Sequence, residues 1–108
     1  MAAVLKSTPV ILTTSDATLY TYSGTRWAIV RSIQAANINT SSAQVVEISL
    51  RRSATNYSLV DNLSIPVGAS ASALADILHM QPGDIIRGYI VSGTTLNVHV
   101  VISYEEYS

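Results

Sequence analysis

The chain has 108 residues and no cysteine, so it is long enough for one folded domain and offers neither disulfides nor thiolate metal ligands. Only 12% of the residues are charged, against about 25% in an average soluble domain, and the net charge is -1. Nucleic-acid binding needs several Lys or Arg side chains. Because Arg51-Arg52 is the only adjacent basic pair, we expect no nucleic-acid partner.

The N-terminal residues do not read as a secretion signal, because Lys6 follows a short apolar stretch instead of preceding a long one. No apolar run approaches the roughly 20 residues of a membrane span. We therefore expect folding in a cytoplasm and no membrane partner. Residues 1–8 are too apolar for a solvated tail, so we predict an N-terminal arm there and a single domain over residues 9–108.

Alternation of apolar and polar residues predicts strands along most of the chain. The clearest has Val46, Ile48 and Leu50 on one face. Near residue 30, Trp27, Ile29, Ile33 and Ala35 share a predicted face that Arg31 interrupts. The predicted strands are residues 9–13, 18–22, 26–36, 44–51, 57–60, 63–67, 85–91 and 96–104.

Turn residues separate these strands. They include Asp61-Asn62, Pro82-Gly83-Asp84 and Ser92-Gly93. About eight short strands at roughly ten-residue spacing are typical of an antiparallel β-sandwich or jelly roll, so the predicted fold class is all-β.

Residues 70–80 break the alternation, because they are rich in Ala and Leu, with Leu74, Ile77 and Leu78 at helical spacing. We predict a short helical turn there. An extended loop-strand is the alternative that the pattern leaves open.

The chain offers little for catalysis. His79 and His99 are the only side chains that titrate near neutrality in their unperturbed state, and a structural role is favoured for both. Asp84 follows Pro82-Gly83, where an aspartate bonds nearby backbone amides. Glu105-Glu106 is expected to keep a frayed C-terminus solvated. No phosphate-binding, metal or hydrolase motif occurs, so we expect no enzyme, cofactor or metal.

The aromatic residues, one Trp and six Tyr, suit interfaces because they combine apolar area with a polar tip. Core packing of Trp27 and Tyr89 and stacking against sugars are the alternative uses.

An open sandwich also leaves unpaired strand edges, which are either protected against further pairing or used as contacts. Pro9 and Pro66 are candidates for protecting an edge. We hypothesise that the arm or an edge strand pairs with a neighbouring subunit. The candidate assembly residues are Val4, Leu5, Tyr20, Tyr22, Tyr104 and Tyr107.

Five segments give the sequence a resemblance to small β-sandwich virion proteins of tailed bacteriophages. They are residues 17–21 (ATLYT), 27–37 (WAIVRSIQAAN), 63–68 (LSIPVG), 80–86 (MQPGDII) and 103–106 (SYEE). They are spread along most of the chain, from residue 17 to residue 106, although none is a chemical signature.

The resemblance implies a structural role in the phage particle, which is assembled in the bacterial cytoplasm. The expected protein is a capsid decoration (cement) protein, a homotrimer that binds the major capsid protein and stabilises the shell. A neck, tail or fibre-base subunit is the first alternative. A glycan- or receptor-binding module on a fibre is the second.

Overall fold

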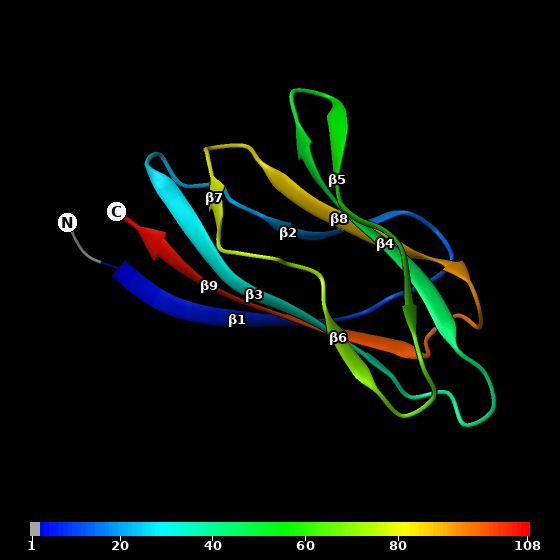
Figure 1. Cartoon of the computed structure of the whole chain (residues 1–108). Coiled ribbons are helices and arrows are strands. Elements are labelled where there is room, and N and C mark those ends of the chain that lie inside the picture. Colours follow the sequence, from blue (N-terminus) through cyan, green and yellow to red (C-terminus); the bar gives the residue numbers. More distant parts are fainter. Residues whose placement is uncertain (1–2) are drawn as a thin grey trace.

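The computed structural model describes residues 3–108, which form nine strands and contain no helix. Figure 1 shows them as two layers. The strands are β1 Ala3–Ile11, β2 Ala17–Thr21, β3 Trp27–Asn37, β4 Gln44–Arg52, β5 Thr55–Ile65, β6 Ser70–Ser72, β7 Leu78–Met80, β8 Ile85–Ser92 and β9 Val98–Tyr107. The predicted all-β fold class is confirmed.

All the pairings are antiparallel, within two sheets. The five-stranded sheet has the order β1-β9-β3, with β6 and β7 both pairing the far side of β3. The four-stranded sheet has the order β2-β8-β4-β5. The arrangement is a β-sandwich whose elongated body measures 47 × 27 × 21 Å.

The core lies between the inward faces of the two sheets. Val46 and Ile48 of β4 are fully buried, as the alternation predicted, and so are Val98 and Ile102 of β9. Burying such branched side chains contributes about 1.5–3 kcal/mol each relative to leaving them exposed. The strands with the cleanest sequence alternation therefore supply the centre of each sheet.

Strand β3 departs from the predicted pattern. Its register against β9 shifts between Val30 and Ser32, so Arg31 is an extra residue in a β-bulge. A one-residue insertion turns every later side chain to the opposite face. As a result Ala28 and Val30 are buried before the bulge, and Trp27 lies on the outer face, 37% exposed. The prediction that Trp27 shares a face with Ile33 is wrong.

Strand β5 replaces two predicted strands and the turn between them. Its register against β4 shifts twice, between Val46 and Ile48 and between Ile48 and Ser49. On β5, Asn62 adopts a left-handed conformation with φ of 56°. The turn-forming residues Asp61-Asn62 thus produce a bulge inside one strand, because asparagine tolerates this conformation as well in a bulge as in a turn.

The predicted helical turn over residues 70–80 is also wrong. Strands β6 and β7 pair with β3 there, and between them the Ala73 N–H donates to the Ile33 carbonyl at 2.8 Å. Ala73 is buried. The backbone groups of β3 that face away from β9 need partners, so pairing with the sheet overrides the helical propensity of alanine and leucine.

The residues predicted as an arm are part of the domain. Residues 3–8 lie in β1, which pairs with β9 in an unbroken register from Ala3 opposite Tyr107 to Ile11 opposite His99. Met1 and Ala2 lie outside the described residues. The separate N-terminal arm is therefore replaced by an edge strand.

The predicted turn role of Asp84 is confirmed, and the structure adds an ion pair. The Asp84 Oδ2 atom accepts a hydrogen bond from the Gln81 N–H at 2.8 Å. The guanidinium of Arg52 donates to both carboxylate oxygens, at 2.9 and 2.5 Å. These hydrogen bonds, that of Arg52 first, lower the pKa of Asp84 below its usual value. The pair fastens the end of β4 to the turn before β8.

Candidate assembly surface

Strand β1 is the outer edge of the five-stranded sheet, and Figure 1 shows it along the rim with no labelled strand beyond it. Just after β1, the Leu12 N–H donates to the Val98 carbonyl, and the Leu12 carbonyl accepts from Leu96. In an antiparallel ladder both backbone groups of one residue point to the same side, and the side alternates. Hence even-numbered residues of β1 bond β9, and odd-numbered residues point their N–H and C=O outward.

The outward set is Ala3, Leu5, Ser7, Pro9 and Ile11. Proline has no N–H, so Pro9 sits where its missing donor breaks no bond of the sheet. Pro9 also blunts that half of the edge against further pairing. The half from Ala3 to Ser7 keeps its donors and acceptors.

Apolar side chains accompany this open half of the edge. Leu5 is 77% exposed and Val4 is 50% exposed. Both were predicted assembly residues, and the structure places them together on β1. A large apolar side chain beside free backbone groups is the combination that edge strands normally avoid.

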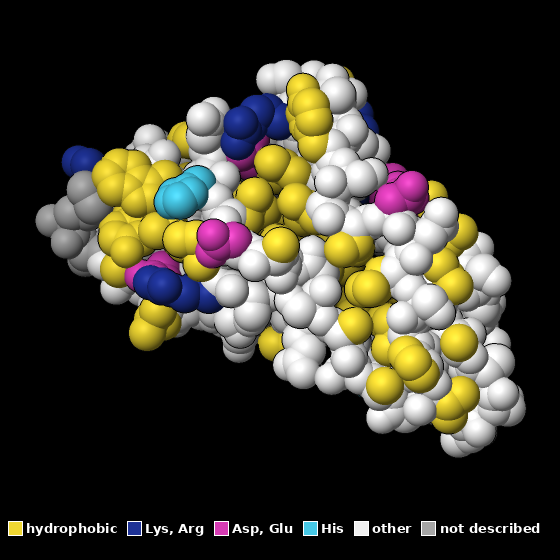
Figure 2. Space-filling model, in the orientation of Figure 1, with side chains coloured by type: hydrophobic (Ala, Val, Ile, Leu, Met, Phe, Trp, Pro, Cys, Tyr) yellow, Lys and Arg dark blue, Asp and Glu magenta, His cyan; other side chains and the backbone are white. Residues whose placement is uncertain are grey.

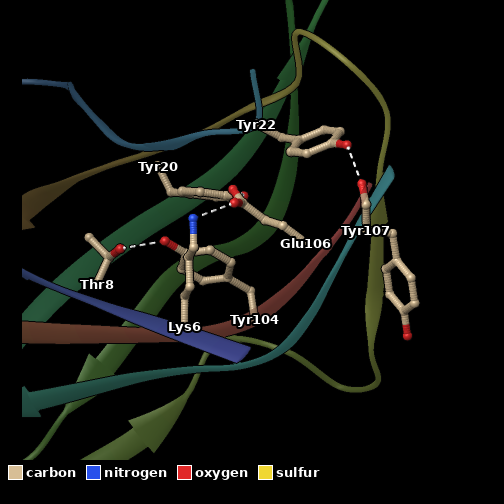
Figure 3. Close-up of polar contacts among 7 residues, drawn as sticks. All are labelled: Lys6, Thr8, Tyr20, Tyr22, Tyr104, Glu106 and Tyr107. Atoms are coloured by element: carbon tan, nitrogen blue, oxygen red, sulfur yellow. Dashed lines mark hydrogen bonds and ion pairs between the residues drawn. The ribbon is translucent and has the colours of Figure 1, made fainter. Parts of the chain in front are cut away.

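A polar cluster fixes this part of β1 to both sheets (Figure 3). The Lys6 ammonium is 2.7 Å from Oε1 of Glu106, and the Tyr20 hydroxyl from β2 donates to Oε2 at 2.5 Å. The hydroxyls of Thr8 and Tyr104 lie 2.9 Å apart and share a hydrogen bond. Residues from β1, β2 and β9 therefore meet at one end of the sandwich.

The cluster also sets the charge of the edge. Hydrogen bonds from Lys6 and then from Tyr20 lower the pKa of Glu106 below its usual value. The hydrogen bond with Glu106 raises the pKa of Lys6. Both groups are accordingly charged at neutral pH, and the only cation of β1 is neutralised within the chain.

The C-terminal residues are held firmly, in contrast to the frayed end that the sequence suggested. Strand β9 lies between β1 and β3, and its Glu105 is buried and ion-paired with Arg31. The Tyr107 hydroxyl donates to Glu105 at 2.9 Å. Hydrogen bonds from Tyr107 and then from Arg31 lower the pKa of Glu105. The pair Glu105-Glu106 thus anchors the strand on both of its faces.

An aromatic pair covers the outer face at the same end. The rings of Trp27 and Tyr107 are stacked with their centroids 5.6 Å apart. The register places Ala3 opposite Tyr107 and Tyr107 opposite Trp27, so the three form one row across the sheet. Figure 2 shows yellow hydrophobic side chains gathered at this end of the molecule. Because the alternation predicted Trp27 on the same face as Ile33, this row was not expected from the sequence.

Three of the predicted assembly tyrosines lie elsewhere than expected. Tyr20, Tyr22 and Tyr104 are buried in the core between the sheets, and the Tyr20 and Tyr104 rings lie 4.1 Å apart. Their hydroxyls reach hydrogen-bond partners at the rim of the core, as buried tyrosines usually do. A partner protein cannot reach these rings, so the candidate surface keeps Val4, Leu5 and Tyr107 and loses the other three.

The remaining edges of the described sheets are shorter or irregular. Strand β2 has a register shift between Thr18 and Tyr20, and β5 carries the bulge at Asn62. Strands β6 and β7 have three residues each. Short or bulged edges resist further pairing, so β1 is the most open edge in the described part of the chain.

A second group of exposed apolar residues lies at the opposite end of the five-stranded sheet. It contains Ile11 at the end of β1, Ile38 after β3 and Leu96 before β9. The Ile38 N–H donates to the Asn97 carbonyl at 2.9 Å, which holds the two connections together. The elongated molecule thus has apolar residues at both ends.

The described residues do not form a recess or an ion site. Over residues 3–108 no pocket is found, and no three His, Asp or Glu side chains gather closely enough to hold a metal ion. His79 lies opposite Ile29 and His99 opposite Ala36, at different ends of β3. Nor does any helix in that range have the length and apolar character to cross a membrane.

No protein-family model matches the sequence, and no curated protein matches it. The structure is similar to a chain from a solved structure of Bacillus endospore appendages, which are described as a family of disulfide-linked pili. The TM-score is 0.54 and the identity 12%, and the match covers 96% of this chain and 83% of the other. At this identity the similarity supports the β-sandwich fold alone.

Proposed function

We propose that this protein is a non-enzymatic structural subunit of a tailed-phage particle, namely a capsid decoration protein that self-associates and binds the major capsid protein. The observation that carries the proposal is the open half of β1, where free backbone groups accompany the exposed Val4 and Leu5. Such an edge is a site for adding a strand from another subunit.

The rest of the molecule supports a mechanical role. The two ends of the described region lie in β1 and β9, which pair with each other. The ion pairs of Lys6 and Arg31 join β9 to its neighbours β1 and β3, and that of Arg52 joins β4 to the turn before β8. A rigid body with few surface charges can present several identical contacts to a shell, and repeated contacts raise avidity without strong single contacts. The homotrimer implied by the phage resemblance remains a prediction.

The proposal is tested with capsids that lack the protein. Purified protein is added, bound protein is measured by co-sedimentation, and the melting of the shell is followed by calorimetry. Saturable binding with a higher melting temperature of the shell supports a decoration role. Absence of binding to capsids at all concentrations contradicts it.

A filament subunit is the second candidate function, covering the tail and fibre-base alternatives. It is favoured by the apolar residues at both ends of the elongated body, and the pilus chain shows that a similar fold occurs in a filament. Head-to-tail contacts between two different surfaces produce filaments when they do not close into a ring. The chain has no cysteine, so a disulfide-linked assembly is excluded. Electron microscopy of the concentrated protein would reveal filaments.

A further inference from the structure

We propose that two copies of this chain pair through β1, antiparallel and around a twofold axis centred on Leu5. This inference rests on the self-association in the proposed function and specifies its contact as a twofold dimer, in place of the homotrimer that the phage resemblance implies. The pairing joins the two five-stranded sheets into one continuous sheet.

The backbone of β1 supports this pairing. The residues with outward N–H and C=O groups include Ala3, Leu5 and Ser7. Around an axis at Leu5, Ala3 faces Ser7 of the second copy and Leu5 faces its own equivalent. Each facing pair exchanges two N–H···O bonds, so every outward donor and acceptor from residue 3 to residue 7 gains a partner.

Pro9 selects the register. Its missing N–H and its ring both disfavour a facing strand. A pairing centred on Lys6 would place Pro9 opposite Ala3 of the second copy, and a pairing centred on Ser7 would place it opposite Leu5. Centring on Leu5 is therefore the longest register that keeps Pro9 clear of residues 3–11 of the second copy.

The side chains are complementary in the same register. Leu5, the most exposed large apolar side chain of the described residues, packs against its own copy on the outer face. On the other face Val4 lies opposite Lys6, whose alkyl stem can cover it while its ammonium stays with Glu106. No uncompensated charge is brought into the contact, because each Lys6 is neutralised in its own chain.

The other edges are poorer partners for β1. Strands β2 and β5 are interrupted by register shifts, and β6 and β7 are short. A contact between β1 and any of these would join an open edge to a blunted one. The twofold contact uses the open edge on both sides, which is the usual form of a dimer interface.

The first test uses the absence of cysteine from the natural chain. In Leu5→Cys the two thiols face each other across a hydrogen-bonded pair with Cα atoms about 5.5 Å apart, within disulfide range. The matched control is Ile11→Cys, which lies on the same face of the same strand and is also exposed. Its two copies would be about 40 Å apart along the paired strands.

Under mild oxidation, Leu5→Cys is expected to form a covalent dimer in high yield, and Ile11→Cys to form little. Equal yields from the two variants, or more from Ile11→Cys, would overturn the twofold pairing.

The second test removes a single outward donor. Ser7→Pro deletes an N–H that β9 does not use, so the subunit keeps its fold, which circular dichroism and melting temperature verify. Ser7→Ala is the control that retains the N–H. In sedimentation velocity the natural chain and Ser7→Ala should shift from the 11.5 kDa monomer towards the dimer with rising concentration, whereas Ser7→Pro stays monomeric.

Oligomers of folded Ser7→Pro equal to those of the natural chain would refute the β1 contact. Such a result leaves the decoration role standing if the same variant still binds capsids. Conversely, a β1 dimer that fails to bind capsids supports the contact and contradicts the proposed function.

Discussion

Strands β1 and β5 are both outermost strands of their sheets, yet they differ in regularity. Strand β1 follows β9 over nine residues without a register shift. Strand β5 is longer, at 11 residues, but it shifts twice against β4 and bends at Asn62. The difference indicates that the chain protects one edge by a bulge and leaves the other edge available.

The two strands also differ in how they are anchored. Strand β5 ends in the fully buried Ile65, whereas the apolar residues of β1 reach at most partial burial, at Val10. Strand β1 is held by its ladder and by polar contacts of Lys6 and Thr8. A strand fixed by hydrogen bonds at the rim keeps its apolar surface for a partner.

The largest expected effect is on the core anchor of β5. Ile65→Ala should lower the free energy of unfolding by about 2–5 kcal/mol, because it leaves a cavity in the buried core. The comparison variant is Val10→Ala in β1, whose loss should be clearly smaller. Urea unfolding of both variants measures the difference, and equal losses would contradict the contrast in anchoring.

The next effect concerns the ion pair of Arg52 and Asp84, which fastens the hairpin of β4 and β5 to the turn before β8. Asp84→Asn should lower the free energy of unfolding at pH 7 by about 1.5–3 kcal/mol, because a charged hydrogen-bond acceptor is lost. The side chain of Asp84 is only 2% exposed, so water cannot replace it.

The pH dependence follows from the lowered pKa of Asp84. Its contribution to stability is fully present above its unfolded pKa of about 3.9 and is lost as the pH falls through the lower, folded pKa. In thermal melts from pH 7 to pH 2, the difference in melting temperature between the natural chain and Asp84→Asn should thus become smaller in acid. A constant gap would refute the role of the carboxylate.

A smaller effect is expected at the bulge that protects β5. Asn62→Val should cost about 1–2 kcal/mol, because a branched side chain is strained at the left-handed φ of 56°. Asn62→Gly is the control, since glycine adopts this conformation freely. Chemical denaturation of both variants measures the cost, and equal stabilities would show that the bulge imposes no such strain.

The smallest effect is expected in the polar cluster beside β1. Tyr20→Phe should cost about 1 kcal/mol, less than is usual for a hydrogen bond to a charged group, because the Glu106 side chain is 24% exposed and water can replace the lost hydroxyl. Because Tyr20 helps to lower the pKa of Glu106, that pKa should rise in the variant, as NMR titration of the carboxyl carbon would record. Tyr57→Phe, at an exposed position, is the control and should change neither quantity.

Much of the fold was predictable because its signals are local. Alternation in β4 and β9 placed Val46 and Val98 on buried faces, and the turn chemistry of Asp84 was read correctly. The candidate surface was predictable only in part. Val4 and Leu5 are exposed as expected, but Tyr20 is in the core, because an aromatic residue with a polar tip suits an interface and the rim of a core equally well.

The errors share a physical origin in the pairing of distant strands. The bulge at Arg31 turned Trp27 outward. Within residues 70–80, strands formed instead of a helical turn because the backbone groups of β3 needed hydrogen-bond partners. Glu105 and Glu106 read as a solvated end, yet their partners Arg31 and Lys6 lie 74 and 100 residues away along the chain. Such partners leave no mark in the local pattern.

By itself, the amino-acid sequence determined that this chain forms an all-β sandwich. Period-two alternation produces sheets with one apolar face, and a chain without long helical segments buries those faces by packing two sheets together. Only the tertiary structure decided which edge stays open, which tyrosines are buried and how the C-terminal carboxylates are neutralised. Those outcomes depend on strand order, bulges and side chains brought together from opposite ends of the chain, and local preferences do not encode them.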